Sequence, residues 1–361
     1  MNPRREPGNT PSSHLLREAG AGGKGLKVVA IGGGTGLSTL LRGLKQYVSR
    51  PSDPHRREGP FISELTAVVT VSDDGGSSGR LRKELKLLPP GDVRNCIVAL
   101  SEDEALLSRL FQYRFRGDST LDGHSFGNLF LAALTGVTGD FAEAVRLSSE
   151  ILATRGHIYP ATISDVQLRG VMDDGSRVSG ETSITHSKRR VTRVELSPAD
   201  VEPLPETLRA IARADLITMG PGSLFTSLIP NILVNGIAEA IASSGAVKAY
   251  VCNLMTQANE SLGLTAADHI RAIYSHAGHP IFEYALMNST TASTQLRAKY
   301  ALEASNQIVV DLDKIKALGV EVIFGDYLLE DEGVARHATG RITNDLLRLS
   351  ATRTRVPLNA E

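Results

Sequence analysis

Residues 28–37 read Val-Val-Ala-Ile-Gly-Gly-Gly-Thr-Gly-Leu, and this stretch is the strongest indication of the fold. Its apolar, mostly β-branched beginning is typical of a buried strand in a parallel sheet. The glycines end that strand, and leucines then recur at helical spacing as far as Leu44. The stretch therefore predicts a strand, a tight glycine turn and a helix, in that order.

The same alternation continues along the chain. Apolar runs predict further strands at residues 65–71, 215–219, 247–252, 308–310 and 320–323, and helical spacing predicts a last helix near residues 342–349. Strands that alternate with helices imply a mostly parallel sheet. We therefore expect an α/β fold with a Rossmann-like, doubly wound sheet, whose functional site lies outside the carboxyl ends of the strands.

The expected organisation is one large domain, residues 25–350, between two tails. Residues 1–24 are rich in Pro, Gly and Ser without periodicity and predict a disordered tail, and residues 351–361 predict a flexible one. Two insertions interrupt the α/β pattern, a helical one at about residues 101–153 and a small β one at about residues 163–197. Within the second, Asp173-Asp174-Gly175 is a hairpin turn signal.

Composition and charge exclude several classes of function. The 39 basic and 40 acidic residues cancel, and aromatic residues make up 5% of the chain without any Trp, so we expect no nucleic-acid partner. Two cysteines provide neither a disulfide framework nor a cysteine zinc site. No apolar run approaches the ~20 residues that span a bilayer, and no apolar segment follows the basic start of the chain. We expect a cytoplasmic protein without a membrane partner.

Two glycine turns are the first candidates for a binding site. A turn between strand and helix presents backbone N–H groups to an anion, and the helix dipole adds positive potential. The first turn lacks the dinucleotide fingerprint, because Leu37 stands where its last glycine belongs, and it lacks the Lys-Ser/Thr pair of a Walker loop. Two such turns can hold the phosphates of a nucleotide diphosphate, although a tight turn of this kind needs no ligand. The candidate nucleotide-binding residues are Gly32, Gly33, Gly34, Thr35, Gly36, Gly220, Pro221, Gly222 and Ser223.

The second predicted strand ends in a polar loop with two adjacent acids. At this place in a doubly wound sheet an acid commonly accepts hydrogen bonds from ribose, whereas two acids together can hold Mg²⁺ through oxygen. Asp73 and Asp74 are therefore the candidates for ribose, for a magnesium ion and for catalysis, and the alternative is a solvated Asp-Gly turn. The same loop offers Gly75, Gly76, Ser77 and Arg80, the last as a bidentate phosphate ligand.

Residues 89–95 predict the start of another helix. Asp92 is a natural N-cap there. Arg94 and Asn95 are therefore the better candidates for a functional role, because they place a cation and an amide near the same cleft.

Residues 123–127 match the G-x-S-x-G pattern of hydrolase nucleophile elbows. An elbow needs a buried strand directly before it, and a polar loop precedes this one. We therefore predict that Ser125 and Asn128 act as helix cap and ligand contacts, with His124 beside them.

Taken in order, these motifs resemble the YvcK/CofD-like family over residues 27–345. The resemblance rests on the two glycine turns and on residues 70–80, 90–95, 123–128 and 252–257. The Asp-Asp-Gly-Gly-Ser-Ser-Gly-Arg and Met-Thr-Gln stretches look like the YvcK branch, the gluconeogenesis factors, rather than the CofD branch.

The resemblance implies a regulator that binds a nucleotide sugar, UDP-N-acetylglucosamine in the better-studied members, without strong catalysis of its own. It implies a role in balancing carbon flow between gluconeogenesis and cell-wall precursor synthesis, needed for normal cell shape during gluconeogenic growth. It adds Asn253, Thr256 and Arg336 to the expected nucleotide-binding residues. Leu264 stands where the family has an aromatic residue linked to the same binding. We further expect a homo-oligomer, with a cell-wall precursor enzyme as a candidate partner.

Two other functions stay open on the sequence. One is a Mg²⁺-dependent transferase that uses the Asp73–Asp74 pair. It would be either a phospholactyl transferase, as in the CofD branch that builds a deazaflavin coenzyme, or a nucleotidyl transferase. The other is an NAD-type site, which the missing fingerprint glycine disfavours.

Overall fold

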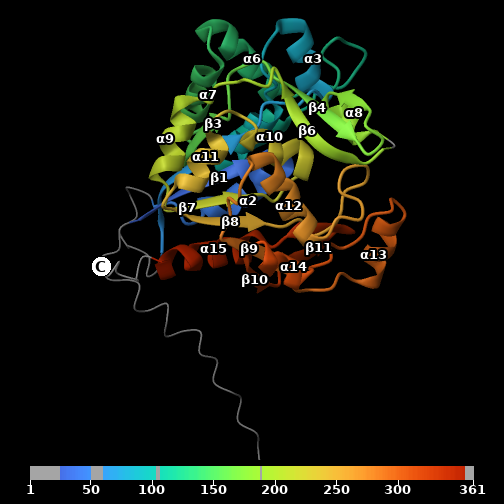
Figure 1. The fold of residues 1–361 in the computed structure, drawn as a ribbon. Coiled ribbons are helices and arrows are strands. Elements are labelled where there is room, and N and C mark those ends of the chain that lie inside the picture. The colour runs from blue at the N-terminus through green and yellow to red at the C-terminus, as the bar shows by residue number, and fades with distance from the viewer. Residues whose placement is uncertain (1–24, 50–59, 103–105, 188, 354–361) are drawn as a thin grey trace, which may run out of the picture.

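The computed structural model describes residues 25–49, 60–102, 106–187 and 189–353 (Figure 1). The tail predicted at residues 1–24, and residues 354–361 of the second predicted tail, lie outside these ranges.

A seven-stranded sheet forms the centre of the molecule, in the order β10-β9-β8-β7-β1-β2-β3. Its strands are β1 (Leu26–Gly32), β2 (Ile62–Val69), β3 (His157–Pro160), β7 (Leu216–Met219), β8 (Val247–Val251), β9 (Tyr284–Asn288) and β10 (Glu321–Gly325). Every neighbouring pair is parallel, which confirms the predicted Rossmann-like α/β fold. The chain builds from β1 outward to β3 and then from β7 outward to β10, so the direction reverses between β1 and β7. A crevice forms at such a switch point, outside the carboxyl ends of the strands.

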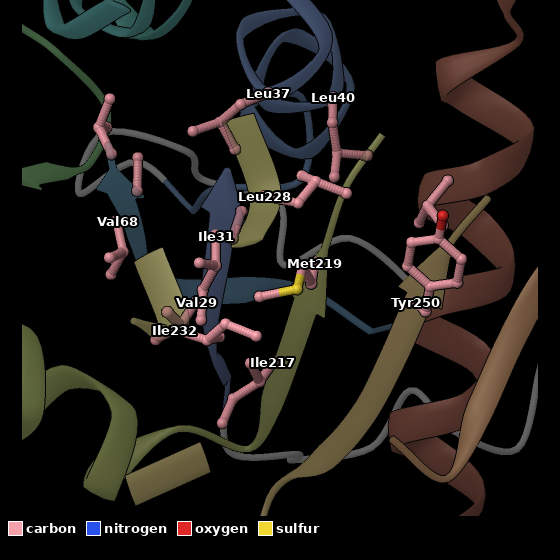
Figure 2. Packing of buried hydrophobic residues seen from close by; sticks show 14 of the residues in the cluster. Val29, Ile31, Leu37, Leu40, Val68, Ile217, Met219, Leu228, Ile232 and Tyr250 are labelled. Carbon is pink, nitrogen blue, oxygen red and sulfur yellow. The ribbon is translucent and has the colours of Figure 1, made fainter. Parts of the chain in front are cut away.

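The first helix packs on the sheet through a row of buried leucines. In α2 (Gly34–Lys45) the buried residues include Leu37, Leu40, Leu41 and Leu44, the spacing that the sequence predicted. α2 packs against β1 and β2 and contacts α4 (Gly91–Leu100) and α15 (Thr339–Arg353). Figure 2 shows Leu37 and Leu40 in the same buried cluster as Ile31 of β1, Met219 of β7 and Tyr250 of β8.

The remaining helices surround this core (Figure 1). They are α3 (Gly76–Leu85), α5 (Leu107–Gln112), α6 (Phe126–Thr138), α7 (Phe141–Ile151), α9 (Pro205–Arg213), the π-helical segment η1 (Leu224–Leu228), α10 (Ile229–Ile232), α11 (Ile237–Ser243), α12 (Ala266–Ala277), α13 (Thr294–Ala301) and α14 (Leu312–Ala317). α12 begins with a capping box, in which Thr265 and Asp268 satisfy each other's backbone N–H groups.

Between β3 and α9 the chain forms a small antiparallel sheet in the order β5-β4-β6. It consists of β4 (Gln167–Met172), β5 (Arg177–Ser179), the short helix α8 (Glu181–Thr185) and β6 (Val191–Ser197). The predicted turn at Asp173-Asp174-Gly175 joins β4 to β5, where the Met172 amide donates to the Ser176 carbonyl at 2.9 Å.

The strand predicted at residues 308–310 is wrong. Ile308 donates its amide to the Leu254 carbonyl at 3.1 Å, so this extended segment lies against the loop after β8 instead of joining the sheet. Its central residue, Val309, is 63% exposed, which a strand buried on both faces would not permit. Three features were not predicted from the sequence: β3 at the edge of the sheet, β9, which holds the place expected for residues 308–310, and the hairpin of β11 (Leu328–Asp331) and β12 (Val334–His337).

No single helix in the described part of the chain is long and apolar enough to cross a membrane. One pair bent by 76°, Leu224–Ile232 with Ile237–Ser243, passes the length and composition test when taken together.

Candidate functional site

The two glycine turns meet at the switch point of the sheet. A Cβ atom at Gly36 would lie 2.2 Å from the carbonyl oxygen of Pro221, so only glycine permits this contact between the turns. At Gly33 a Cβ atom would lie 2.5 Å from the Thr70 side chain and 2.8 Å from a carboxylate oxygen of Asp92. These glycines therefore bring four separate chain segments to one place.

The first turn leaves backbone N–H groups open to an anion. Gly34, which has a left-handed φ of +61°, donates its amide to the Asp92 carboxylate, and the Leu37 amide makes a long 3.4 Å bond to Gly33. Within the described residues, the amides of Thr35 and Gly36 have no hydrogen-bond acceptor. Two N–H groups at the start of a twelve-residue helix are a suitable cradle for a phosphate.

The second turn is largely satisfied by the protein itself. Gly222 donates its amide to Asn253 Oδ1 at 3.0 Å and accepts from Asn253 Nδ2 at 2.7 Å. The carboxylate of buried Glu260 accepts the next amides, Phe225 at 2.7 Å and Thr226 at 3.0 Å. A carboxylate thus already lies where the helix after this turn would present its N–H groups to a phosphate.

A group of acids borders the first turn. The Asp73 carboxylate accepts from the Gly75 amide at 2.8 Å and from the Ser78 hydroxyl. Burial raises its pKa above the ordinary value, and the charge of Asp74 raises it further. Burial and then the charge of Asp73 raise the pKa of Asp92 to about 7. These two carboxyl groups therefore lie close enough for the charge of Asp73 to disfavour ionisation of Asp92.

Two glutamates that the sequence analysis missed extend the acidic group. Burial, followed by the charges of Asp73 and Asp92, raises the pKa of Glu181 to about 9. Burial likewise raises the pKa of Glu260 to about 7, against the opposing effect of its bonds to backbone amides. Glu181 comes from α8 of the small sheet, and Glu260 from the loop after β8. No local pattern marks either residue, because tertiary packing alone brings them to the cleft.

The predicted capping role of Asp92 is wrong. Pro90 occupies the N-cap position of α4, and Asp92 lies in the first turn of the helix. Its carboxylate bonds to the Gly34 amide of the glycine turn instead of capping its own helix.

Asp73 and Asp74 point to different partners. Asp74 Oδ1 accepts from the amide of Thr182 at 2.8 Å and from its hydroxyl at 2.7 Å. A Cβ atom at Gly180 would lie 2.1 Å from Asp74 Oδ2, so glycine is required beside this bond. Asp74 thus fastens the small sheet to the end of β2, while Asp73 faces Asp92. No group of three or more His, Cys, Asp or Glu side chains among the described residues is arranged to hold a metal ion.

A buried polar network lies next to the acids. Arg94 Nη1 donates to Ser125 Oγ at 2.5 Å and to Asn128 Oδ1 at 3.0 Å. The Asn128 amide group donates to Ser77 Oγ at 3.0 Å, and this hydroxyl lies 2.9 Å from His124 Nδ1. Ser125 is the N-cap of α6, as predicted. Burial lowers the pKa of His124, so its imidazole is neutral at physiological pH.

The other predicted site residues hold parts of the cleft together. Arg94 Nη2 donates to Asn95 Oδ1 at 2.8 Å, and Arg80 donates to the Asp122 carbonyl of the loop before α6. Thr256 is buried, and its hydroxyl accepts the Asn306 amide at 2.9 Å.

Arg336 lies in the β11–β12 hairpin and forms an exposed ion pair with Asp331 at 2.9 Å. Its neighbour His337 approaches the Cys252 carbonyl at 3.1 Å, which places the hairpin beside the carboxyl end of β8. Leu264 packs half-buried against the core.

Comparisons with known proteins agree with this architecture. The family model described as 2-phospho-L-lactate transferase CofD matches residues 28–328. The gluconeogenesis factor of Halalkalibacterium halodurans is 49% identical over 320 residues, which cover 89% of this chain and 95% of that protein. The gluconeogenesis factor of Bacillus subtilis is 46% identical over 323 residues, which cover 90% of this chain and 98% of that protein.

A crystal structure of a protein from Bacillus halodurans superimposes with a TM-score of 0.84 at 49% identity, covering 90% of this chain and 100% of that one. The chain therefore belongs to the YvcK/CofD-like family, in the branch whose curated members are named gluconeogenesis factor.

Proposed function

We propose that this protein binds a nucleotide sugar, UDP-N-acetylglucosamine or a close analogue, and regulates carbon flow between gluconeogenesis and cell-wall precursor synthesis. In this proposal it is a cytoplasmic regulator needed for normal cell shape on gluconeogenic carbon sources. The observation that carries the binding is the pair of open amides, Thr35 and Gly36, at the switch point of the sheet. These amides can donate hydrogen bonds to the diphosphate, so its binding does not require a basic surface.

The groups around these amides suit the rest of such a ligand. Arg94 is buried and held by neutral partners, so its positive charge is available to a phosphate. Glu181 stays protonated at neutral pH because its pKa is about 9, and a protonated carboxyl can donate a hydrogen bond to a sugar or ribose oxygen. The cleft therefore offers both the anion-binding and the hydroxyl-binding chemistry of a nucleotide sugar.

Calorimetry tests the binding. We expect heat on adding UDP-N-acetylglucosamine, and roughly tenfold weaker binding for Arg94→Gln, since a hydrogen bond to a charged group is worth about 1.5–3 kcal/mol. Arg297, which lies exposed on α13, provides the matched control Arg297→Gln. An absence of heat at millimolar ligand would rule the proposal out, and displacement of the ligand by NAD would instead support a dinucleotide site.

The regulatory role needs a test in cells. A strain that lacks the gene should lose its shape on a gluconeogenic carbon source and keep it on glucose. The Arg94→Gln variant should fail to restore shape where Arg297→Gln succeeds. Co-purification with a cell-wall precursor enzyme, and a homo-oligomeric mass in solution, are further expectations of this role.

The Asp73–Asp92 arrangement supports a second candidate, a Mg²⁺-dependent transferase acting on a nucleotide diphosphate-linked substrate. Carboxylate oxygens are the donors that Mg²⁺ prefers. Burial raises the pKa of both groups, and a bound cation that stabilised their charged forms would lower these pKa values. Asp73 and Asp92 would hold the ion, with Asp74 occupied by Thr182. Bound Mg²⁺ would supply positive charge to the phosphoryl oxygens.

Turnover assays separate the two candidates. The transferase proposal predicts a transfer product from a nucleotide-linked donor with Mg²⁺, abolished in Asp73→Asn while nucleotide binding persists. The exposed hairpin residue Asp173 provides a matched control, Asp173→Asn. If wild-type protein forms no product with any nucleoside triphosphate or nucleotide-linked donor, the transferase proposal is wrong.

A further inference from the structure

A basic pocket lies between α2 and α4, beside the first glycine turn. It encloses about 260 Å³. Its wall includes Thr35, Ser38 and Arg42 of α2, Arg94 and Asn95 of α4, and Arg114 of the segment after α5. We call it the arginine pocket, because the described residues of its wall include these three arginines and no acid.

None of the three arginines forms an ion pair with a described residue. Arg42 is exposed, and Arg114 Nη1 donates to the neutral Gly123 carbonyl at 2.9 Å. Arg94 is only 8% exposed, and its terminal nitrogens donate to the neutral oxygens of Ser125, Asn128 and Asn95.

The buried Nε of Arg94 has no acceptor among the residues that the structure describes. Burial lowers the pKa of Arg94, and the charge of Arg114 lowers it further, so the two guanidinium groups repel each other. An anion in the pocket would reduce this repulsion and accept a hydrogen bond from Arg94 Nε.

The start of α2 adds backbone donors to the same place. Thr35 carries one of the two open amides and also lines the pocket. Ser38 and Arg42 follow it at helical spacing on the face of α2 that lies toward α4, whereas Gly36 lies on Pro221. Open helix amides and unpaired guanidinium groups are the combination that recognises phosphate.

We propose that the arginine pocket is a phosphoryl-binding subsite. Its ligand is either the diphosphate of the nucleotide sugar or the phosphate of a second, smaller metabolite. The shared chemistry is a phosphoryl group held by Arg42, Arg94 and Arg114 at the start of α2. This subsite deepens the proposed function, because Thr35 and Arg94 belong to both, and inorganic phosphate probes it without the nucleotide sugar.

A phosphorus NMR titration with inorganic phosphate tests the subsite on the full chain. Wild-type protein should bind phosphate saturably at one site. Arg42→Glu and Arg114→Gln should each bind roughly tenfold more weakly or worse, the usual effect of losing a charge-assisted bond. Arg297→Glu, an exposed arginine on α13, should bind as the wild type does. The Arg42 side chain makes no hydrogen bond or ion pair with a described residue, so its replacement removes no structural contact. Arg42→Glu therefore keeps the test valid if Arg114→Gln unfolds.

The proposal is overturned if phosphate does not saturate, or if Arg42→Glu binds it as tightly as the wild type. Adding UDP-N-acetylglucosamine then identifies the source of the phosphoryl group. Displacement of phosphate supports occupation by the nucleotide's own diphosphate, and simultaneous binding supports a second phosphorylated ligand. If the nucleotide sugar does not bind while phosphate still depends on Arg42, the subsite stands and the proposed function falls.

Discussion

The carboxyl group of Asp92 joins two segments of the chain, and its contribution to the free energy of unfolding depends on pH. Its carboxylate holds the Gly34 amide of the first glycine turn, next to the charge of Asp73. Because its pKa is about 7 in the folded protein and 3.8 ordinarily, the native state keeps a proton that the unfolded chain has lost between those values. The free energy of unfolding therefore falls as pH rises through this window.

Replacing Asp92 by Asn should flatten that pH dependence. The amide oxygen can still accept from Gly34 but carries no charge. Between about pH 5.5 and about pH 8.5, we expect the stability of Asp92→Asn relative to wild type to rise by roughly 1–2 kcal/mol, less than the full shift implies because only the part of this interval below the pKa of about 7 lies inside the window. Urea denaturation at both pH values measures it. A stability difference that does not change with pH would contradict the assigned pKa.

Gly36 tests the contact between the two glycine turns. An added methyl group would meet the backbone of Pro221, which cannot move aside as a flexible side chain can. We expect Gly36→Ala to lower the free energy of unfolding by about 2–3 kcal/mol. The control is Gly136→Ala in α6, where the methyl group meets nothing and alanine favours the helix by about 0.5–1 kcal/mol. Equal effects of the two substitutions in thermal unfolding would show that the turns are not in contact.

At the scale of elements, the small antiparallel sheet depends on Asp74 for its position over the cleft. The bond to Thr182 anchors α8, and α8 carries Glu181 toward Asp73 and Asp92. The insertion is therefore part of the site and supplies one of its titrating groups.

Removing the hydrogen bonds between Asp74 and Thr182 should make α8 open more often and leave the central sheet intact. In Asp74→Ala, hydrogen exchange at the Thr182 amide should accelerate at least tenfold, because its acceptor is gone, while β1 and β2 keep their protection. The hairpin variant Asp173→Ala should leave Thr182 unchanged, since that exposed carboxylate holds no described partner. Unchanged exchange in Asp74→Ala would mean that packing alone holds the insertion.

At the scale of the whole molecule, the net charge is close to zero, but the cleft contains one acidic and one basic region. The carboxyl groups of Asp73, Asp92 and Glu181 border the first glycine turn, and the arginine pocket adjoins the same turn at Thr35. A ligand that combines phosphates with hydroxyl groups can use both regions at once. The global composition excludes a basic surface but does not reveal this local separation.

Binding across the cleft should stabilise the fold as a unit. With free UDP-N-acetylglucosamine at a hundred times its Kd, the free energy of unfolding should rise by about 2.7 kcal/mol. Hydrogen exchange should slow at both the first glycine turn and α8, although more than a hundred residues separate them in the chain. Protection confined to the glycine turn would place the ligand away from the small sheet.

Local sequence was sufficient wherever the structure rests on local physics. The structure confirms the apolar run before Gly32, the leucine spacing of α2 and the turn at Asp173, each of which depends on residues a few positions apart. The same reasoning failed at residues 308–310, where a short apolar run lies against a loop because β9 holds that place in the sheet.

Tertiary structure alone determined which polar groups share the cleft. Asp92 follows the pattern of a helix cap, yet its carboxylate turns to Gly34, which is distant in sequence. Glu181, Glu260 and Arg114 carry no local signal, and they reach the site through the insertion, the loop after β8 and the segment after α5. Periodicity and capping report the energetics of neighbours along the chain, whereas a binding site is assembled by long-range packing that brings distant charges together.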